Sequence, residues 1–380
     1  MNHAALPVFA AQDLPTWKRA VLKVGSSLLA GEGEGLSAKH ALALAQFVSA
    51  QIAAGREVVI VSSGAVAAGR GILHRQPAAG VAMAERQALA ALGQAPLIAL
   101  WQRFFDRPVA QVLLTHDDLR NRRRYLNARA TLQALLSLNA VPVINENDTV
   151  SVDELKLGDN DNLAAVVAAL VDADALFIAT DIDGFYSANP RQHADAQPIL
   201  DVEALTPEFY AMAGEAGSGV GTGGMRTKLE AAAKAAAAGI ETFLFNGGRA
   251  DTVAALSRGQ LHGTRFRPAQ NRMAARKYWL RNVPLEAGAI LIDEGAAGAV
   301  RERGASLLPG GVLSAEGDFR RGDMIEIRRG SDGHTIARGV SQYSAADVRR
   351  LVRRHSREIE GILGYSYGEN IIHRDDLVVI

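Results

Sequence analysis

Cysteine is absent from this chain of 380 residues, and its absence removes several kinds of site at once. A chain without thiols forms no disulfide, no thiolate zinc site and no cysteine nucleophile. An excess of charge is missing too, because 41 basic side chains (Lys and Arg) are balanced by 41 acidic ones (Asp and Glu). No global charge therefore draws the protein toward nucleic acid or a membrane surface.

Long uninterrupted apolar runs are also lacking. Residues 1–17 have no basic segment followed by a long apolar one, and the apolar stretch 163–179 is broken by Asp172 and Asp174. We expect neither a signal peptide nor a membrane span, and hence a cytoplasmic protein. The length of the chain predicts two domains.

What the sequence does contain, up to about residue 262, is a regular alternation of short β-branched runs and alanine-rich helical patterns. The runs do not alternate between polar and apolar residues, which is typical of strands covered on both faces. The pattern therefore predicts an α/β fold with a mainly parallel sheet between two helix layers, and ligands bind such sheets at the carboxyl ends of the strands. The predicted strands are 20–24, 58–61, 109–114, 141–144, 176–179 and 242–245, and the predicted helices are 37–54, 83–104, 125–138, 161–171 and 228–238.

A glycine-rich segment, 217–228, leads into the last of these helices. Glycine lets backbone N–H groups converge, the helix N-terminus adds partial positive charge, and Lys228 adds a full charge, so the segment is predicted to bind phosphate. It is not a P-loop, because threonine precedes lysine here. The alternative is a glycine-rich surface loop.

Two strand ends carry further polar groups. Lys23 lies inside an apolar strand and requires an anionic partner, either a ligand or a structural ion pair, and Gly25 and Ser26 follow it. The strand at 58–61 is followed by Ser63 and Gly64 and then by a helix, whose first N–H groups can hold a carboxylate or a phosphate.

Carboxylates and amides are concentrated in residues 145–148 and 158–162. Turns and helix caps use one or two such groups, so the excess suits lysines and an α-amino group as partners, although Asp161 or Asn162 could also cap a helix beginning at Leu163. A further buried strand runs into Thr180 and Asp181, where a nucleotide could bind.

Together these motifs resemble the amino acid kinase family, over residues 18 to about 262, and within it the enzymes that phosphorylate glutamate. The motifs are Val-Leu-Lys-Val-Gly-Ser-Ser (21–27), Val-Ser-Ser-Gly-Ala (61–65), Tyr-Leu-Asn-Ala-Arg (125–129), Ile-Asn-Glu-Asn-Asp (144–148), Gly-Asp-Asn-Asp-Asn-Leu (158–163) and Gly-Thr-Gly-Gly-Met-Arg-Thr-Lys (221–228).

Later in the chain, Asp-Glu-Gly-Ala (293–296) and Arg-Gly-Ala-Ser-Leu-Leu-Pro (303–309) resemble a PUA module. The resemblance implies a three-layer αβα amino acid kinase fold followed by a small β-rich PUA domain. The expected parts are an N-terminal tail (1–17), a kinase domain (18–265), a basic linker (266–285), a PUA domain (286–364) and a C-terminal tail (365–380).

The resemblance implies ATP-dependent phosphorylation of the γ-carboxylate of L-glutamate to L-glutamyl 5-phosphate, the first step of proline biosynthesis. A carboxylate is already ionised at neutral pH, so this reaction needs no general base. It does need positive charge around the phosphoryl group during transfer. The implied cofactors are ATP and Mg²⁺, with the Mg²⁺ arriving bound to ATP rather than in a metal site built by the protein.

By motif position, the resemblance makes Lys23 and Lys228 hold the phosphoryl oxygens, while Asp161 orients both lysines. It assigns substrate binding to Ser63, Gly64, Asn145, Asp148, Asn160 and Lys156. It assigns nucleotide binding to Lys23, Gly25, Ser26, Thr180, Asp181, Thr222, Gly223, Gly224, Met225, Arg226, Thr227 and Lys228.

The implied partners are L-glutamate, proline as a feedback inhibitor and, transiently, the reductase that consumes the acyl phosphate; we also expect a homo-oligomer. One alternative is a kinase for another acidic amino acid, such as N-acetylglutamate or aspartate. The acids at 145–148 and 159–161 argue against an acetylated substrate, which has no ammonium charge to satisfy them.

A second alternative is an RNA-binding or RNA-modifying protein that acts through its PUA domain. The stretch 265–281 carries six basic residues beside Tyr278 and Trp279, a composition that can bind RNA. Residues 286–364, however, contain 12 arginines and 12 acidic residues, without the basic excess of a phosphate-reading surface. RNA is therefore not expected to be the main partner.

Overall fold

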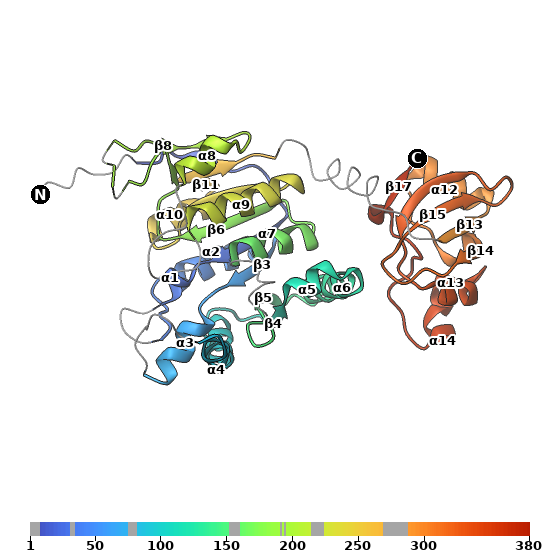
Figure 1. Ribbon diagram of the computed structural model, residues 1–380, viewed down its shortest axis with the longest axis horizontal. Helices are drawn as coiled ribbons and strands as arrows, with labels where there is room; N and C mark the ends of the chain where they lie inside the picture. The colour runs from blue at the N-terminus through green and yellow to red at the C-terminus, as the bar shows by residue number, and fades with distance from the viewer. Residues whose placement is uncertain are drawn as a thin grey trace, which may run out of the picture. The chain divides into compact units, whose positions relative to one another are not determined.

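The computed structural model describes residues 8–30, 35–74, 82–151, 160–190, 192–193, 195–213, 224–268 and 288–380. The chain divides into two compact units, Met1–Arg272 and Met273–Ile380. Figure 1 draws the described part of the first unit in blue through yellow to light orange, and that of the second in deeper orange to red.

An eight-stranded sheet forms the centre of the first unit, in the order β4-β5-β3-β2-β6-β10-β12-β9. All neighbouring strands are parallel except β10 and β12. The mainly parallel sheet predicted from the sequence is thus confirmed, with one antiparallel pair near an edge. The strands are β2 (Arg19–Val24), β3 (Glu57–Ser62), β4 (Val109–Leu114), β5 (Val141–Glu146), β6 (Ala175–Thr180), β9 (Asp201–Val202), β10 (Glu241–Asn246) and β12 (Gly263–Phe266).

Helices cover both faces of this sheet. Successive strand residues point to opposite faces, and the apolar ones divide into two buried clusters accordingly. One face is covered by α2 (Ala41–Ala53), α4 (Met83–Gln102) and α10 (Ala250–Ser257), and the other by α6 (Arg122–Ser137), α7 (Asn160–Leu170) and α9 (Met225–Ala237). Figure 1 shows α7 and α9 lying side by side.

Shorter elements connect these layers. The remaining helices are α1 (Ser26–Leu29), α3 (Ala65–Ile72), α5 (His116–Arg120) and α8 (Pro207–Met212), and two small antiparallel ribbons pair β1 (Gln12–Asp13) with β11 (Gln260–Leu261) and β7 (Phe185–Tyr186) with β8 (Pro198–Ile199). Residues predicted as part of an N-terminal tail therefore belong to the first unit: β1 is paired, and Phe9 is buried against Tyr186.

Helices α3 and α4 cross at unusually close range. A Cβ atom on Gly93 of α4 would lie 1.8 Å from the carbonyl oxygen of Ala65, and one on Gly69 of α3 would lie 2.0 Å from that of Leu89. Only glycine permits such an approach at these two positions. The crossing therefore fixes α4 against α3, which begins immediately after Gly64.

The second unit is a five-stranded sheet in the order β14-β13-β15-β16-β17 with helices packed around a core of its own. Its elements are β13 (Gly288–Ile292), α12 (Glu294–Arg303), β14 (Val312–Gly317), β15 (Met324–Arg329), β16 (Thr335–Val340), α13 (Ala345–Leu351), α14 (Ile359–Leu363) and β17 (Leu377–Val379). Residues 365–380, predicted as a C-terminal tail, supply β17 to this sheet, and Ile371 and Ile372 are buried in the core.

Within the described ranges, no helix is both long and apolar enough to cross a membrane. The predicted linker, 266–285, lies largely outside the described residues.

Candidate functional site

Two buried lysines share one buried aspartate at the carboxyl edge of the sheet. Side chains alternate along β2, so Lys23 faces the same side as Val21, which is the side covered by α7 and α9. Asp161, in the first turn of α7, is fully buried and forms ion pairs with both Lys23 and Lys228, the latter at 3.0 Å between Nζ and Oδ2. Lys228 belongs to the first turn of α9, so three elements meet at one carboxylate.

The electrostatics of this triad favour the ionised carboxylate. Burial raises the pKa of Asp161, but the charges and hydrogen bonds of Lys23 and Lys228 outweigh burial and hold the pKa well below its ordinary value of 3.8. One carboxylate facing two ammonium groups leaves one positive charge in excess. A buried excess of positive charge is a place where an anion binds.

Backbone geometry around the triad also suits an anion. Helix α9 begins after Gly224, and Thr227 in its first turn donates to the Gly224 carbonyl at 2.8 Å and to Asp161 Oδ2 at 3.1 Å. Gly25 lies so close to Lys23 that a Cβ there would come within 3.7 Å of Nζ. The N-terminus of α9 and the Lys23 ammonium therefore lie on either side of Asp161.

A second polar group, formed entirely of hydroxyl and amide side chains, follows the ends of β3 and β5. Asn160 Nδ2 donates to Ser63 Oγ at 2.7 Å and to Asn145 Oδ1 at 3.0 Å. Asn145 Nδ2 in turn donates to Gln94 Oε1, on α4, at 3.0 Å. This amide chain (Gln94, Asn145 and Asn160) passes around the carboxyl edge of the sheet from one helix layer to the other.

Position 64, next to the amide chain, requires glycine. Gly64 has a φ of +112°, which would be strained for a residue with a side chain, and Gly64 is the N-cap of α3. Ser62 faces the opposite side, where its Oγ accepts a hydrogen bond of 2.9 Å from the indole Nε1 of buried Trp101. Ser62 thus has a structural role, whereas Ser63 faces the site.

Asp148 lies half-buried in the turn after β5. That turn is held by Glu146, whose buried carboxylate accepts a hydrogen bond of 2.8 Å from Ser151 Oγ, and by Gln87 Nε2, which donates to the Ser151 carbonyl at 3.1 Å. The first contact ties the strand end before Asp148 to Ser151, and the second ties Ser151 to α4. Glu146 and Gln87 were not among the predicted site residues.

The ends of β6 and β10 form the third part of the edge. Thr180 is buried and donates to Asp181 Oδ1 at 3.2 Å, and its carbonyl accepts a hydrogen bond of 2.9 Å from the Gly247 N–H. Asn246 Nδ2 donates to Asp183 Oδ1 at 2.8 Å. Asp183 lies in the polar turn predicted after β6 but was not itself assigned to the nucleotide, and Asn246 lies in no recognisable motif.

The structure thus brings several predicted residues together: Lys23, Lys228 and Asp161 in the triad, Thr227 and Gly224 beside it, and Ser63, Asn145 and Asn160 in the polar group. Arg226 instead pairs with Glu230 at 3.4 Å on an exposed face of α9, and Met225 packs against the apolar cluster. Ser26 is exposed at the start of α1. Lys156, Thr222 and Gly223 lie outside the described residues.

The capping alternative for Asp161 and Asn162 does not hold. Helix α7 begins at Asn160, so both residues lie inside its first turn rather than before it. Asn162 Oδ1 accepts a hydrogen bond of 2.6 Å from Lys234 Nζ.

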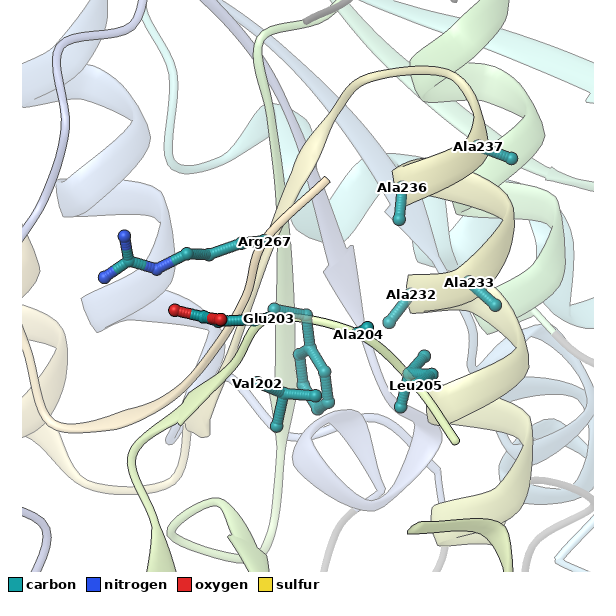
Figure 2. A pocket seen from close by; sticks show the side chains of 10 residues that line it. Val202, Glu203, Ala204, Leu205, Ala232, Ala233, Ala236, Ala237 and Arg267 are labelled. Atoms are coloured by element: carbon teal, nitrogen blue, oxygen red, sulfur yellow. The ribbon is translucent and has the colours of Figure 1, made fainter. Parts of the chain in front are cut away.

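A hollow of about 270 Å³ lies elsewhere in the first unit, between α9 and the strands β9 and β12. Figure 2 shows alanine side chains of α9 on one side of it and Val202, Glu203 and Arg267 on the other. Its walls are mostly apolar, and none of the triad or amide-chain residues lines it. We therefore place the candidate active site at the carboxyl edge of the sheet.

In the described ranges no group of three His, Asp or Glu side chains is arranged to hold a metal ion.

Comparisons with known proteins identify the family of the chain. The model of the amino acid kinase family matches residues 18–246, and that of the PUA domain matches residues 288–363. A glutamate 5-kinase from Xanthomonas axonopodis pv. citri (strain 306) is 74% identical over 95% of this chain and 100% of its own length. A glutamate 5-kinase from Xylella fastidiosa (strain M23) is 69% identical over 98% of both chains. Among solved structures, the UMP kinase of Bacillus anthracis covers 67% of this chain and 98% of its own at 16% identity, with a TM-score of 0.47, a likeness too weak to add to the argument.

Proposed function

The chain belongs to the amino acid kinase family and, within it, to the glutamate 5-kinases, and from this premise we propose that it transfers the γ-phosphoryl group of ATP to the side-chain carboxylate of L-glutamate. The products are L-glutamyl 5-phosphate and ADP, and the reaction is the first step of proline biosynthesis. The observation that carries the proposal is the buried Lys23–Asp161–Lys228 triad at the carboxyl edge of the sheet.

The triad suits phosphoryl transfer between two anions. An ionised carboxylate attacks the γ-phosphorus, the bond from that phosphorus to the β,γ-bridging oxygen breaks, and the electron pair leaves with ADP, so no proton has to be removed. Lys23 and Lys228 neutralise the negative charge that the equatorial oxygens carry during transfer. Asp161 forms an ion pair with each ammonium group and so holds both at one place. Mg²⁺ bound to ATP supplies further neutralisation, as is usual for kinases.

The amide chain and the turn after β5 suit the amino acid end of glutamate. Ser63 and Gly64 lie next to the N-terminus of α3, where an anionic group is favoured. Asn145, Asn160 and Asp148 offer acceptors for the α-ammonium group, and Lys156 is assigned to the substrate by motif alone. The nucleotide is assigned to Gly25, Ser26, Thr180, Asp181 and the 222–228 segment.

The test is a substrate comparison. Purified protein is incubated with ATP and Mg²⁺ and with glutamate, N-acetylglutamate or aspartate, and hydroxylamine traps any acyl phosphate as a hydroxamate. We expect hydroxamate with glutamate and little with the other two acids. Faster turnover of aspartate or N-acetylglutamate would overturn the assignment of the substrate.

The chemistry of the product suggests one partner, and the family resemblance implies a second ligand, proline. The free α-amine of L-glutamyl 5-phosphate lies within ring-closing reach of an activated carbonyl, and such intramolecular attack has effective molarities of about 10⁵ M or more, so the product cyclises to a lactam unless it is consumed. We therefore include in the proposal a transient complex with the reductase that consumes the acyl phosphate. From the family resemblance we also include inhibition by proline at the glutamate site. Lactam yield that does not fall as reductase is added would contradict the first, and proline inhibition that glutamate does not relieve would contradict the second.

A further inference from the structure

Gln94 belongs to the amide chain but to none of the motifs that mark the site. It lies on α4, it is more than nine-tenths buried, and its Oε1 accepts the hydrogen bond from Asn145 Nδ2 at 3.0 Å. The neighbouring Gly93 presses α4 against α3. The position of Gln94 relative to Ser63, just before α3, is therefore set by backbone contact rather than by flexible side chains.

The hydrogen bonds of the amide chain (Gln94, Asn145 and Asn160) run in one direction. Each amide has one end that donates and one that accepts, so the orientation of one member dictates that of the next. With Gln94 accepting, Asn145 turns its Nδ2 toward Gln94 and its Oδ1 toward Asn160, and Asn160 then donates through Nδ2. The carbonyl oxygen of Asn160 is left at the end of the chain.

Two atoms of the chain have no hydrogen-bond partner among the described residues, although both are buried: Asn160 Oδ1, an acceptor, and Gln94 Nε2, a donor. Buried polar groups are nearly always paired, so unpaired ones beside a binding site indicate ligand groups. Asn160 Oδ1 matches an N–H donor. The reverse orientation of the chain would instead present an amide N–H, which repels an ammonium group.

We propose that Gln94 is a positioning residue for substrate recognition, which sets the direction of the Gln94–Asn145–Asn160 chain so that Asn160 presents a carbonyl oxygen to the α-ammonium group of the substrate. This inference rests on the proposed function, because it requires a substrate with a free α-amino group. It predicts that Gln94 Oε1 affects glutamate binding through Asn145, without contacting glutamate itself.

Gln94→Met tests it, since methionine has a similar length and no hydrogen-bonding group of comparable strength. The loss of one directing hydrogen bond should raise the KM for glutamate by about fivefold to tenfold, while the KM for ATP stays within about twofold. Gln94→Leu replaces this variant if the methionine variant does not fold. Gln94→Glu keeps an acceptor for Asn145 and should raise the KM for glutamate less than Gln94→Met does.

The matched control is Gln102→Met on the same helix. Gln102 is the last residue of α4, and its Nε2 donates to the carbonyls of Phe105 and Arg107, which follow the helix and do not belong to the amide chain. The control should lower the melting temperature and leave the KM for glutamate unchanged. An unchanged KM in Gln94→Met, an equal rise in the KM values for both substrates, or equal impairment of the Glu and Met variants would overturn the inference. Wild-type protein that forms no glutamyl hydroxamate would instead refute the proposed function itself.

Discussion

At the scale of single residues, the triad concentrates charge that most folds avoid burying. Two ammonium groups and one carboxylate share a site where Asp161 is fully buried and the lysines nearly so. Burying these charged groups costs more desolvation free energy than burying hydrophobic side chains of similar volume would. The arrangement is therefore better explained by a role in phosphoryl transfer than by a contribution to stability.

We expect the turnover number of Lys228→Met to fall at least about 100-fold while the protein remains folded. The reason is that the ammonium group stabilises the negative charge of the phosphoryl group most strongly in the transition state. Steady-state rates with saturating glutamate and ATP measure this. Lys234→Met on the same helix is the control, since Lys234 Nζ donates to Asn162 Oδ1 outside the triad. Near-normal turnover in a folded Lys228→Met protein would remove Lys228 from the site.

Asp161 makes the stability of the fold depend on pH. Its pKa is lower in the folded than in the unfolded state, so the ionised form stabilises the fold above the ordinary pKa of 3.8, and this contribution is lost only as pH falls from there toward the depressed folded pKa. Asp161→Asn should therefore lower the free energy of unfolding by a constant amount between pH 5 and 8, about 3–5 kcal/mol for a broken buried pair.

Below pH 3.8, the difference between wild type and Asp161→Asn should shrink. Denaturant titrations across this range measure it. Asp251→Asn is the control: its carboxylate is 70% exposed and pairs with Arg249, so the change should stay below about 1 kcal/mol. A difference that varies between pH 5 and 8 would show that Asp161 is not the buried anion described here.

The sequence predicts which residues end the strands, and so it predicts most residues of the candidate site. Lys23, Ser63 and Asn145 are visible because a polar residue at the carboxyl end of an apolar run has few structural uses. Gln94 is not visible, because a helical pattern does not say which residue of α4 meets which strand end. The pairing of Gln94 with Asn145 becomes apparent only once the packing of α4 against the sheet is known.

At the scale of elements, β2, β3, β4, β5, β6 and β10 are predicted to within about two residues, since each forms a short apolar run. The strands β9 and β12 and the two ribbons escape prediction because their strands have two to four residues each, too few for a period. Helix α3 is predicted only as a helix of unknown length after Gly64. The crossing of α3 and α4 has no signal in one sequence, because a glycine in a helix looks the same whether or not a backbone lies against it.

Gly93→Ala tests that crossing. The new Cβ would lie 1.8 Å from a backbone oxygen of α3, which cannot rotate away, so the helices must separate. We expect a loss of about 1–3 kcal/mol in unfolding free energy and a raised KM for glutamate, since Gln94 moves with α4. Gly298→Ala in α12 is the control, because nothing lies within 4 Å of that Cβ.

The control should be neutral or stabilising by up to about 1 kcal/mol, as expected for a glycine replaced by alanine inside a helix. Thermal or denaturant unfolding measures both changes. Equal stability of Gly93→Ala and wild type would mean that the close contact of α3 and α4 does not position the site.

At the scale of the whole molecule, every described group of the site belongs to the first unit, and the second unit has its own sheet and core. Composition and length predicted two domains, and both family matches lie within the two units. The exact boundaries stay a prediction. What the sequence could not show is that the last residues return to the sheet of the second unit, because β17 is only three residues long.

A chain truncated after Pro268 should therefore still phosphorylate glutamate. This end point keeps β12, which pairs with β10, and the ion pair of Arg267 with Asp201 beside it. A chain ending at Asn246 is the matched control: it loses β12 and also α10, whose Val253 and Leu256 are buried in the core, so it should fail to fold. Hydroxamate formation and circular dichroism distinguish the two. If the chain ending at Pro268 is folded but inactive, the second unit completes the catalytic site, and the assignment of all chemistry to the carboxyl edge of the eight-stranded sheet is wrong.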